Sequence, residues 1–125
     1  MLFGELGEII LYVQNMDAQF EFYHSLLGFP VVYQDNESVQ ACSWILLDTG
    51  ACKLALHSGG QRCLGKDAPK IVFFVHDLKC AYDKLRENGV DVCDIFSPAP
   101  NTFVANTFDP EGNSVSFEST TPLDS

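Results

Sequence analysis

The side chains best able to do nucleophilic or metal chemistry in this sequence are three histidines and five cysteines. His24, His57 and His76 are scattered along the chain, and no Ser/His/Asp arrangement can be argued around them. The cysteines are odd in number and include no C-x-x-C pair or metal-knuckle spacing, so we expect reduced thiols. Covalent catalysis therefore has no support in the sequence, and we assign no catalytic residue.

The composition predicts a single folded domain over residues 1–125. At 46% hydrophobic and 19% charged residues, with ten Phe, four Tyr and one Trp, the chain is typical of globular proteins. The formal net charge of −10 would repel the phosphate backbone of a nucleic acid. No apolar run approaches the roughly 18 residues of a membrane span, and the N-terminal segment lacks a basic signal-peptide region. We expect a cytoplasmic protein that binds neither nucleic acid nor membrane.

An internal repeat predicts how the chain is organised. Residues 8–23, EIILYVQNMDAQFEFY, align with residues 70–85, KIVFFVHDLKCAYDKL, at a constant offset of 62. Each copy opens with a five-residue apolar run typical of a buried strand, IILYV or IVFFV. We therefore expect two copies of one module, at about 7–57 and 70–119, joined by a linker rich in glycine and charge at 58–69.

Each copy continues with a helix and then strands. In the second copy an apolar stripe over residues 78–85 predicts a helix, with Asp77 as its N-cap and Gly89 at its end. The corresponding residues of the first copy are the stripe Phe20, Tyr23 and Leu27 and the terminating Gly28. The strand-like segments that follow are FPVVYQ, ACSWILLD and CKLALHS in the first copy, and VDVCDIF, TFVANTFD and NSVSFES in the second. Each half thus reads strand, helix, strand, strand, strand.

Three stretches, FYHSLLGF, KIVFFVHDLKCAYDKLRENGV and DPEGNSVSFE, resemble the vicinal oxygen chelate superfamily. That group includes glyoxalase I, extradiol dioxygenases, fosfomycin-resistance enzymes and bleomycin-binding proteins, and the resemblance covers about residues 7–119. It implies an α+β fold in which two βαβββ modules form a cupped mixed sheet, as in glyoxalase, bleomycin-resistance protein and dihydroxybiphenyl dioxygenase. It also implies a homodimer.

The resemblance further implies where a metal ion would be held in this chain. Reactive members bind a divalent cation near the start of the first strand and on the last strand of each module, which here are Glu8, Ala55, Lys70 and Ser116. A catalytic metal usually needs about three histidine or carboxylate ligands, and a protonated amine has no lone pair to donate. We therefore expect no metal and no other cofactor.

For each of two pairs of polar residues, the sequence allows two interpretations. Glu8 and Lys70 either form an ion pair at the floor of the cup or are separate polar residues at exposed strand starts. His57 and Glu118, two residues beyond Ala55 and Ser116, either form a polar rim or acid/base couple, or simply lie at strand ends near water.

Aromatic residues complete the predicted site. Trp44 either lines the cup, where its ring would stack on a planar ligand, or packs against a helix. Tyr12 and Phe74 share strand faces with Glu8 and Lys70. The predicted ligand-binding residues are Glu8, Tyr12, Trp44, His57, Lys70, Phe74, Ser116 and Glu118.

These observations lead to one favoured function and two alternatives. We expect a metal-independent small-molecule-binding protein resembling the bleomycin-resistance members, with a cationic or aromatic ligand favoured by the negative net charge and the aromatic positions. The first alternative is a divergent glyoxalase-like lyase, isomerase or dioxygenase whose metal is held by Glu8, His57 and Glu118. The second is a domain whose cup is filled by its own side chains and which acts only by associating with partners.

Overall fold

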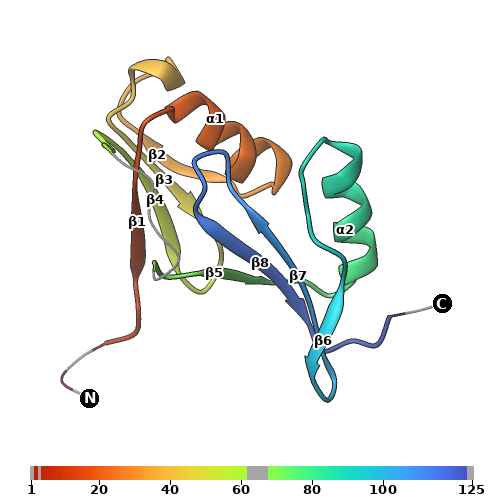
Figure 1. Cartoon of the computed structure of the whole chain (residues 1–125). Helices are drawn as coiled ribbons and strands as arrows, with labels where there is room; N and C mark the ends of the chain where they lie inside the picture. Colours follow the sequence, from red (N-terminus) through yellow and green to blue (C-terminus); the bar gives the residue numbers. More distant parts are fainter. Residues whose placement is uncertain (1, 3, 62–67, 124–125) are drawn as a thin grey trace. The chain divides into compact units, whose positions relative to one another are not determined.

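The computed structural model describes residues 2, 4–61 and 68–123 (Figure 1). Cys63 and the central part of the expected linker, residues 62–67, lie outside the described residues. The chain divides into two compact units, Met1–Arg62 and Cys63–Ser125.

Unit 1 is a βαβββ module in which the first strand returns to pair with the last. Its elements are β1 (Glu8–Val13), α1 (Met16–Phe20), the π-helix η1 (Glu21–Leu26), β2 (Val31–Gln34), the 3₁₀ helix η2 (Val39–Ala41), β3 (Trp44–Asp48) and β4 (Lys53–Ser58). The four strands form one sheet in the order β1-β4-β3-β2. β1 runs parallel to β4, whereas the other neighbours are antiparallel.

Unit 2 repeats that topology with a single helix. Its elements are β5 (Ile71–Phe74), α2 (Leu78–Glu87), β6 (Phe96–Ala99), β7 (Thr102–Phe108) and β8 (Ser114–Ser119). The sheet order is β5-β8-β7-β6, again with a parallel pair between the first and last strands. The predicted pair of βαβββ modules with mixed sheets is therefore confirmed. No helix among the described residues is long and apolar enough to cross a membrane.

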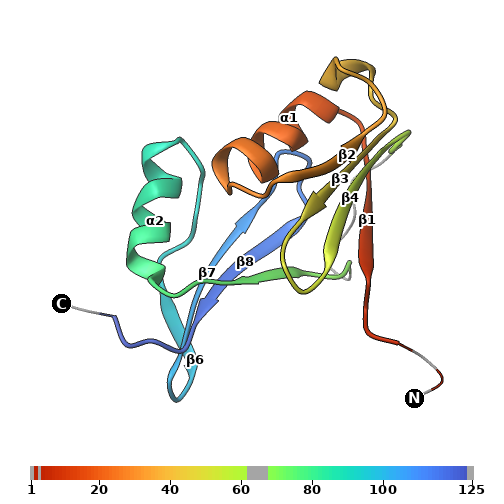
Figure 2. The same ribbon diagram turned by 180° about the vertical axis from the view of Figure 1, so that it is seen from behind.

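In each unit one face of the sheet is covered by the helix and the other face is open (Figures 1 and 2). A parallel pair needs a crossover connection, which the helix supplies, and strand side chains alternate between the two faces. In unit 1 the covered face buries Val13, Ile45, Leu47 and Leu56, each at most 2% exposed. The residues between them on the same strands point to the open face, and they include the predicted ligand residues of this unit.

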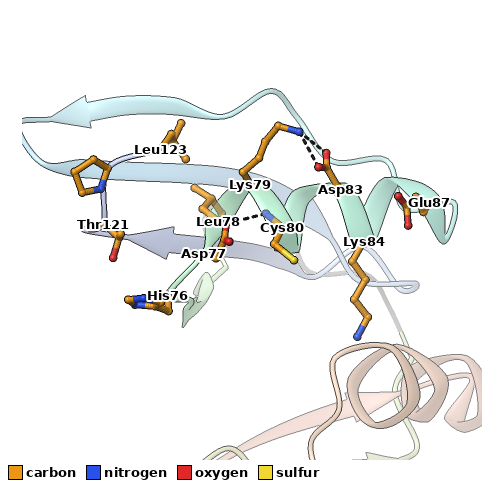
Figure 3. Close-up of a pocket in the computed structure, with 11 residues that line it drawn as sticks. His76, Asp77, Leu78, Lys79, Cys80, Asp83, Lys84, Glu87, Thr121 and Leu123 are labelled. Carbon is orange, nitrogen blue, oxygen red and sulfur yellow. Dashed lines mark hydrogen bonds and ion pairs between the residues drawn. The ribbon is translucent and has the colours of Figure 1, made fainter. Parts of the chain in front are cut away.

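Helix α2 begins and ends as its sequence predicts. The Asp77 side chain accepts a 3.0 Å hydrogen bond from the Cys80 backbone N–H, which makes it the N-cap (Figure 3). At the other end the N–H groups of Gly89 and Val90 donate to the carbonyls of Arg86 and Leu85, a Schellman motif. Gly89 has φ +79°, a left-handed conformation that glycine adopts without strain.

The first helix departs from its predicted apolar stripe. Tyr23 is fully buried, but Phe20 and Leu27 are half-buried, and Phe22 is buried in their place. The reason is the π-helix, in which the N–H of Leu27 donates to the carbonyl of Phe22 five residues earlier. One extra residue per turn rotates the following side chains relative to a regular α-helical stripe. Gly28, with φ +85°, ends the helix as predicted.

The prediction of a strand over VDVCDIF, residues 90–96, is wrong, because β6 starts only at Phe96. Val92 is buried, and the Cys93 N–H donates to the carbonyl of Asn106 on β7. The Asp91 carbonyl accepts a 2.9 Å hydrogen bond from the Thr107 hydroxyl rather than from a backbone N–H. The segment before β6 thus runs beside β7 with isolated bonds rather than a regular ladder.

The N-cap of α2 can be tested by replacing Asp77 with alanine. We expect Asp77→Ala to lower the free energy of unfolding by about 1 kcal/mol, because the cap hydrogen bond is lost. The matched control is Asp83→Ala, which removes an exposed ion pair to Lys79 in the same helix and should change stability little. Urea unfolding followed by circular dichroism measures both, and equal effects would contradict the cap.

Candidate functional site

The open face of the unit 1 sheet is built from three cross-strand rows. Paired positions on β1, β4 and β3 share a face, so the strand register defines each row. The rows are Tyr12, His57 and Trp44; Ile10, Ala55 and Leu46; and Glu8, Lys53 and Asp48. An aromatic, an apolar and a polar row therefore follow one another along the strands.

The aromatic row forms a continuous line of rings. The Tyr12 and His57 ring centroids are 5.0 Å apart with their planes at 44°, and the Trp44 ring meets His57 edge-on at 5.8 Å. Tyr12 is 62% exposed, and His57 and Trp44 are half-buried. Of the two alternatives for Trp44, its position on the open face favours the surface that a ligand can reach.

His57 is oriented by the backbone of its own strand. Its Nδ1 lies 2.6 Å from the Ser58 carbonyl oxygen, which can only accept a hydrogen bond. Nδ1 therefore carries a proton, and in the neutral ring Nε2 has a lone pair available for a donor. Gly60 adds a close backbone contact beside this row, since a Cβ there would lie 2.5 Å from the Tyr12 carbonyl oxygen.

The polar row contains one engaged pair and one unpaired carboxylate. Lys53 Nζ lies 3.2 Å from Asp48 Oδ1. The pKa of Asp48 is lowered, first by the Gly50 N–H that donates to its carboxylate and then by Lys53. Glu8, opposite Lys53 in the ladder, is exposed, and its carboxylate forms no hydrogen bond or ion pair with any other described residue. It is the negative charge on this face that remains available.

The open face of unit 2 carries a hydrogen-bonded cluster on neighbouring strands. Lys70 Nζ donates a 3.1 Å hydrogen bond to Asn106 Oδ1, and the Ser116 hydroxyl donates to the same oxygen. Ser116 and Asn106 are paired across β8 and β7, which places both side chains on one face. The next row contains Phe74 and Glu118, so the four predicted ligand residues of unit 2 share this face.

The positions at which the family would hold a metal do not fit a divalent cation here. Ala55 contributes a methyl group and is fully buried in the sheet. The Lys70 amine and the Ser116 hydroxyl both direct their hydrogens to Asn106, so they act as donors rather than as ligands. Within either unit, the described residues contain no group of three or more His, Cys, Asp or Glu side chains able to hold a metal ion.

The alternative metal set fails on spacing inside unit 1. Glu8 pairs with Lys53 and His57 pairs with Tyr12, so Glu8 and His57 lie two rows apart. Four residues along a strand correspond to about 13 Å, too far for two side chains to bind one ion. The Glu8–Lys70 pair and the His57–Glu118 couple would each join the two units, and both stay predictions.

Two residues of these faces were not predicted from the sequence as site residues. Asn106 anchors the cluster of unit 2, and Lys53 occupies the centre of the polar row of unit 1. The available signal for Asn106 was its position as the single amide in the segment TFVANTF, whose other residues are apolar or threonine. Its partners could not be identified without the register of β7 against β8.

A separate hollow of about 540 Å³ lies along α2 and the C-terminal segment of unit 2 (Figure 3). Its lining includes His76, Cys80 and Leu123, and the Lys79–Asp83 ion pair lies beside it. None of the predicted ligand residues lines it. It lies on the helix side of unit 2, so the open sheet faces remain the better candidate site.

A family model described as the Glyoxalase/Bleomycin resistance protein/Dioxygenase superfamily matches residues 5–117 of the chain. The chain belongs to this superfamily. No curated protein matches it. Among the solved structures that are similar to it, a glyoxalase family protein from Enterococcus faecalis has 19% identity and a TM-score of 0.77, with 94% of this chain and 99% of that chain covered. The antibiotic binding protein TnmS3 from Streptomyces sp. CB03234 has 18% identity and a TM-score of 0.74, with 95% and 98% covered, and lactoylglutathione lyase from Agrobacterium tumefaciens has 18% identity and a TM-score of 0.70, with 92% of each chain covered.

Membership of the superfamily and these neighbours establish the fold. Superfamily members bind small molecules, and the neighbours include a protein named for binding and another named as a lyase. The fold therefore leaves both kinds of function open, and the side chains of the site must decide between them.

The exposure of the aromatic row makes a prediction about stability. Tyr12→Ala should change the free energy of unfolding by less than about 0.5 kcal/mol, because the ring lies on the solvent side of the sheet. Val13→Ala, one residue away on the buried face, should cost about 2 kcal/mol. Urea unfolding compares the two variants, and a large loss for Tyr12→Ala would show that its ring belongs to a core.

Proposed function

We propose that this protein binds a planar aromatic small molecule, neutral or cationic, on the aromatic row of unit 1, without a metal ion. The observation that carries the proposal is the line of rings formed by Tyr12, His57 and Trp44 on the open face of the sheet. The order of the rows along that face supports an aromatic ligand with a polar or cationic end.

Stacking supplies the first step of recognition. Aromatic pairs contribute about 0.5–1.5 kcal/mol beyond the area that they bury. The His57 ring is held by the Ser58 carbonyl and contacts the rings on both sides of it, so less side-chain entropy is lost when a planar molecule is placed on the row. The buried methyl of Ala55 in the next row lets a flat ring system extend along the sheet without a protruding side chain.

Polar groups on the same face supply orientation. The lone pair of His57 Nε2 accepts a hydrogen bond from a donor on the ligand. Glu8, unpaired among the described residues, lies about 13 Å along the strand from Tyr12 and attracts a cationic group at that distance. The net charge of −10 favours the same sign of ligand at long range.

Binding without chemistry is favoured by the groups at the metal-equivalent positions. Glu8 is the one carboxylate among them, and the methyl, the ammonium and the hydroxyl at the other three positions cannot replace the further histidine or carboxylate ligands of a catalytic cation. The similarity to an antibiotic binding protein supports this choice, and the similarity to a lactoylglutathione lyase keeps a divergent enzyme as the competing function.

The proposal includes the assembly that presents this site. Residues 1–125 act as one glyoxalase-like domain, with the modules and linker as expected from the sequence, and the protein is a cytoplasmic homodimer. Support for a dimer comes from large apolar side chains that are exposed outside the aromatic row, such as Val32 at 51% and Phe74 at 81%. A second copy would remove such surface from water.

Ligand binding can be measured with proflavine, a planar aromatic cation, and with bleomycin. We expect binding to change the emission of Trp44, the chain's only tryptophan, and to raise the melting temperature. At 100 times the dissociation constant, a ligand stabilises the fold by about 2.7 kcal/mol. Tyr12→Ala and His57→Ala should each weaken binding about tenfold, since each removes one ring of the row.

The matched control is Tyr33→Ala. Tyr33 is another exposed tyrosine on the open face of unit 1, but it lies on β2 opposite Leu46, at the edge of the apolar row and outside the aromatic row. Its replacement should weaken binding much less than Tyr12→Ala does, because its ring is not part of the line of three rings. Binding that Tyr33→Ala weakens as much as Tyr12→Ala, or no binding of any planar aromatic compound, would contradict the proposal.

Metal independence has a test of its own. Dialysis against EDTA should leave both proflavine binding and the melting temperature unchanged, because no step of recognition uses a cation. Metal analysis of the purified protein should find no stoichiometric Zn, Ni, Mn or Fe. Near-stoichiometric metal that is lost together with an activity in Glu8→Ala would support the lyase alternative instead.

A further inference from the structure

We infer that the open face of unit 2 carries a binding site for a carboxylate, formed by Lys70 and Asn106. This site belongs to a different unit from the aromatic row, and it is inferred independently of the function proposed above. It follows from the way in which the side chains at the metal-equivalent positions of unit 2 are hydrogen-bonded.

The orientation of the Asn106 amide is fixed by its two donors. The Lys70 ammonium can only donate, so the Asn106 atom 3.1 Å from Nζ is the oxygen. The Ser116 hydroxyl donates to the same oxygen, and Ser116 is only 2% exposed. The Asn106 NH₂ group must therefore point away from this pair, and it has no hydrogen-bond partner among the described residues.

The cluster leaves hydrogen-bond donors and a positive charge unused. An ammonium has three N–H donors, and Lys70 uses one of them in its hydrogen bond to Asn106. The NH₂ group of Asn106 has two further donors. A carboxylate has two oxygens that accept such bonds, and charge-assisted bonds are roughly twice as strong as neutral ones. Ser116 holds the amide in place before the ligand arrives, so the donors are already oriented.

The Glu118 carboxylate lies one row away from the Asn106 amide on this face. Ser116, which pairs with Asn106, is two residues before Glu118, about 6.6 Å along the strand. Lys70 approaches Asn106 from the opposite side, because Ile71 pairs with Val115 and Lys70 is therefore level with Ser114. A carboxylate bound on the Ser114 side of Asn106 lies closer to the Lys70 ammonium than to the Glu118 carboxylate.

Apolar groups beside the cluster indicate what the carboxylate is attached to. Phe108 pairs with Ser114 and is 63% exposed, and Val72 pairs with Ser116 and is 43% exposed. Both point to the same face as the cluster, because paired residues share a face. An aromatic or otherwise apolar monocarboxylate would place its acid group on Lys70 and Asn106 and its body against these side chains.

Benzoate is a direct probe of this site, with benzamide and benzylamine as uncharged and cationic isosteres. We expect benzoate to shift the backbone amide NMR signals of Lys70, Asn106, Ser114 and Phe108 in ¹⁵N-labelled protein, and the two isosteres to leave them unchanged. Lys70→Met should weaken benzoate binding at least about tenfold, because a charged donor is lost. Lys70→Arg keeps the charge and donors and should retain binding.

Lys84→Met is the matched control, since it makes the same change of net charge at an exposed position on α2. It should leave benzoate binding unchanged. No benzoate-dependent shifts at these four residues, or shifts that survive Lys70→Met in a protein with an otherwise native spectrum, would overturn the inference. The aromatic row is followed separately by proflavine and Trp44 emission, so failure of one site is distinguished from failure of the other.

Discussion

The parallel pairing of the first and last strands within each unit is the constraint on which both candidate sites depend. It aligns Ile9 with Leu54 in unit 1 and Ile71 with Val115 in unit 2, so the two registers are equivalent. Each helix crosses over one face of its sheet to allow this pairing, and the opposite face stays open. The chain thus builds the same surface twice from one topology, and only the side chains on it differ.

Much of this topology could be predicted from the sequence, because it depends on local patterns. The Asp77 cap and the terminating Gly28 and Gly89 act within a few residues, and the structure contains each of them. The two apolar runs form strands as predicted, but not buried ones, because in each strand one face is exposed, with Tyr12 at 62% and Phe74 at 81%. The π-helix of unit 1 and the late start of β6 could not be predicted in this way. Both depend on which carbonyl accepts the hydrogen bond of a given backbone N–H, and packing between segments distant in sequence determines that partner.

The candidate sites show the same division between local and long-range information. Alternation along a strand predicted that Tyr12 shares a face with Glu8, but not which residues of the neighbouring strands lie beside either one. The register places His57 and Trp44 beside Tyr12 and leaves Glu8 two rows away. Asn106 was not predicted as a site residue for the same reason, since the role of an amide in a strand cannot be assigned until its cross-strand neighbours are known.

The two open faces lead to different kinds of recognition. At the site proposed in unit 1 a ligand would meet ring surfaces, where affinity comes from area and shape, and the unpaired charge on this face, that of Glu8, is negative. At the site proposed in unit 2 it would meet an ammonium and an oriented amide, where affinity comes from a few directed hydrogen bonds. A lysine at a metal-equivalent position can still attract a negatively charged oxygen, but it does so by donating protons rather than by accepting electron pairs. Such a group holds an acid in place and polarises it less than a divalent cation would, which agrees with the proposed function of binding without chemistry.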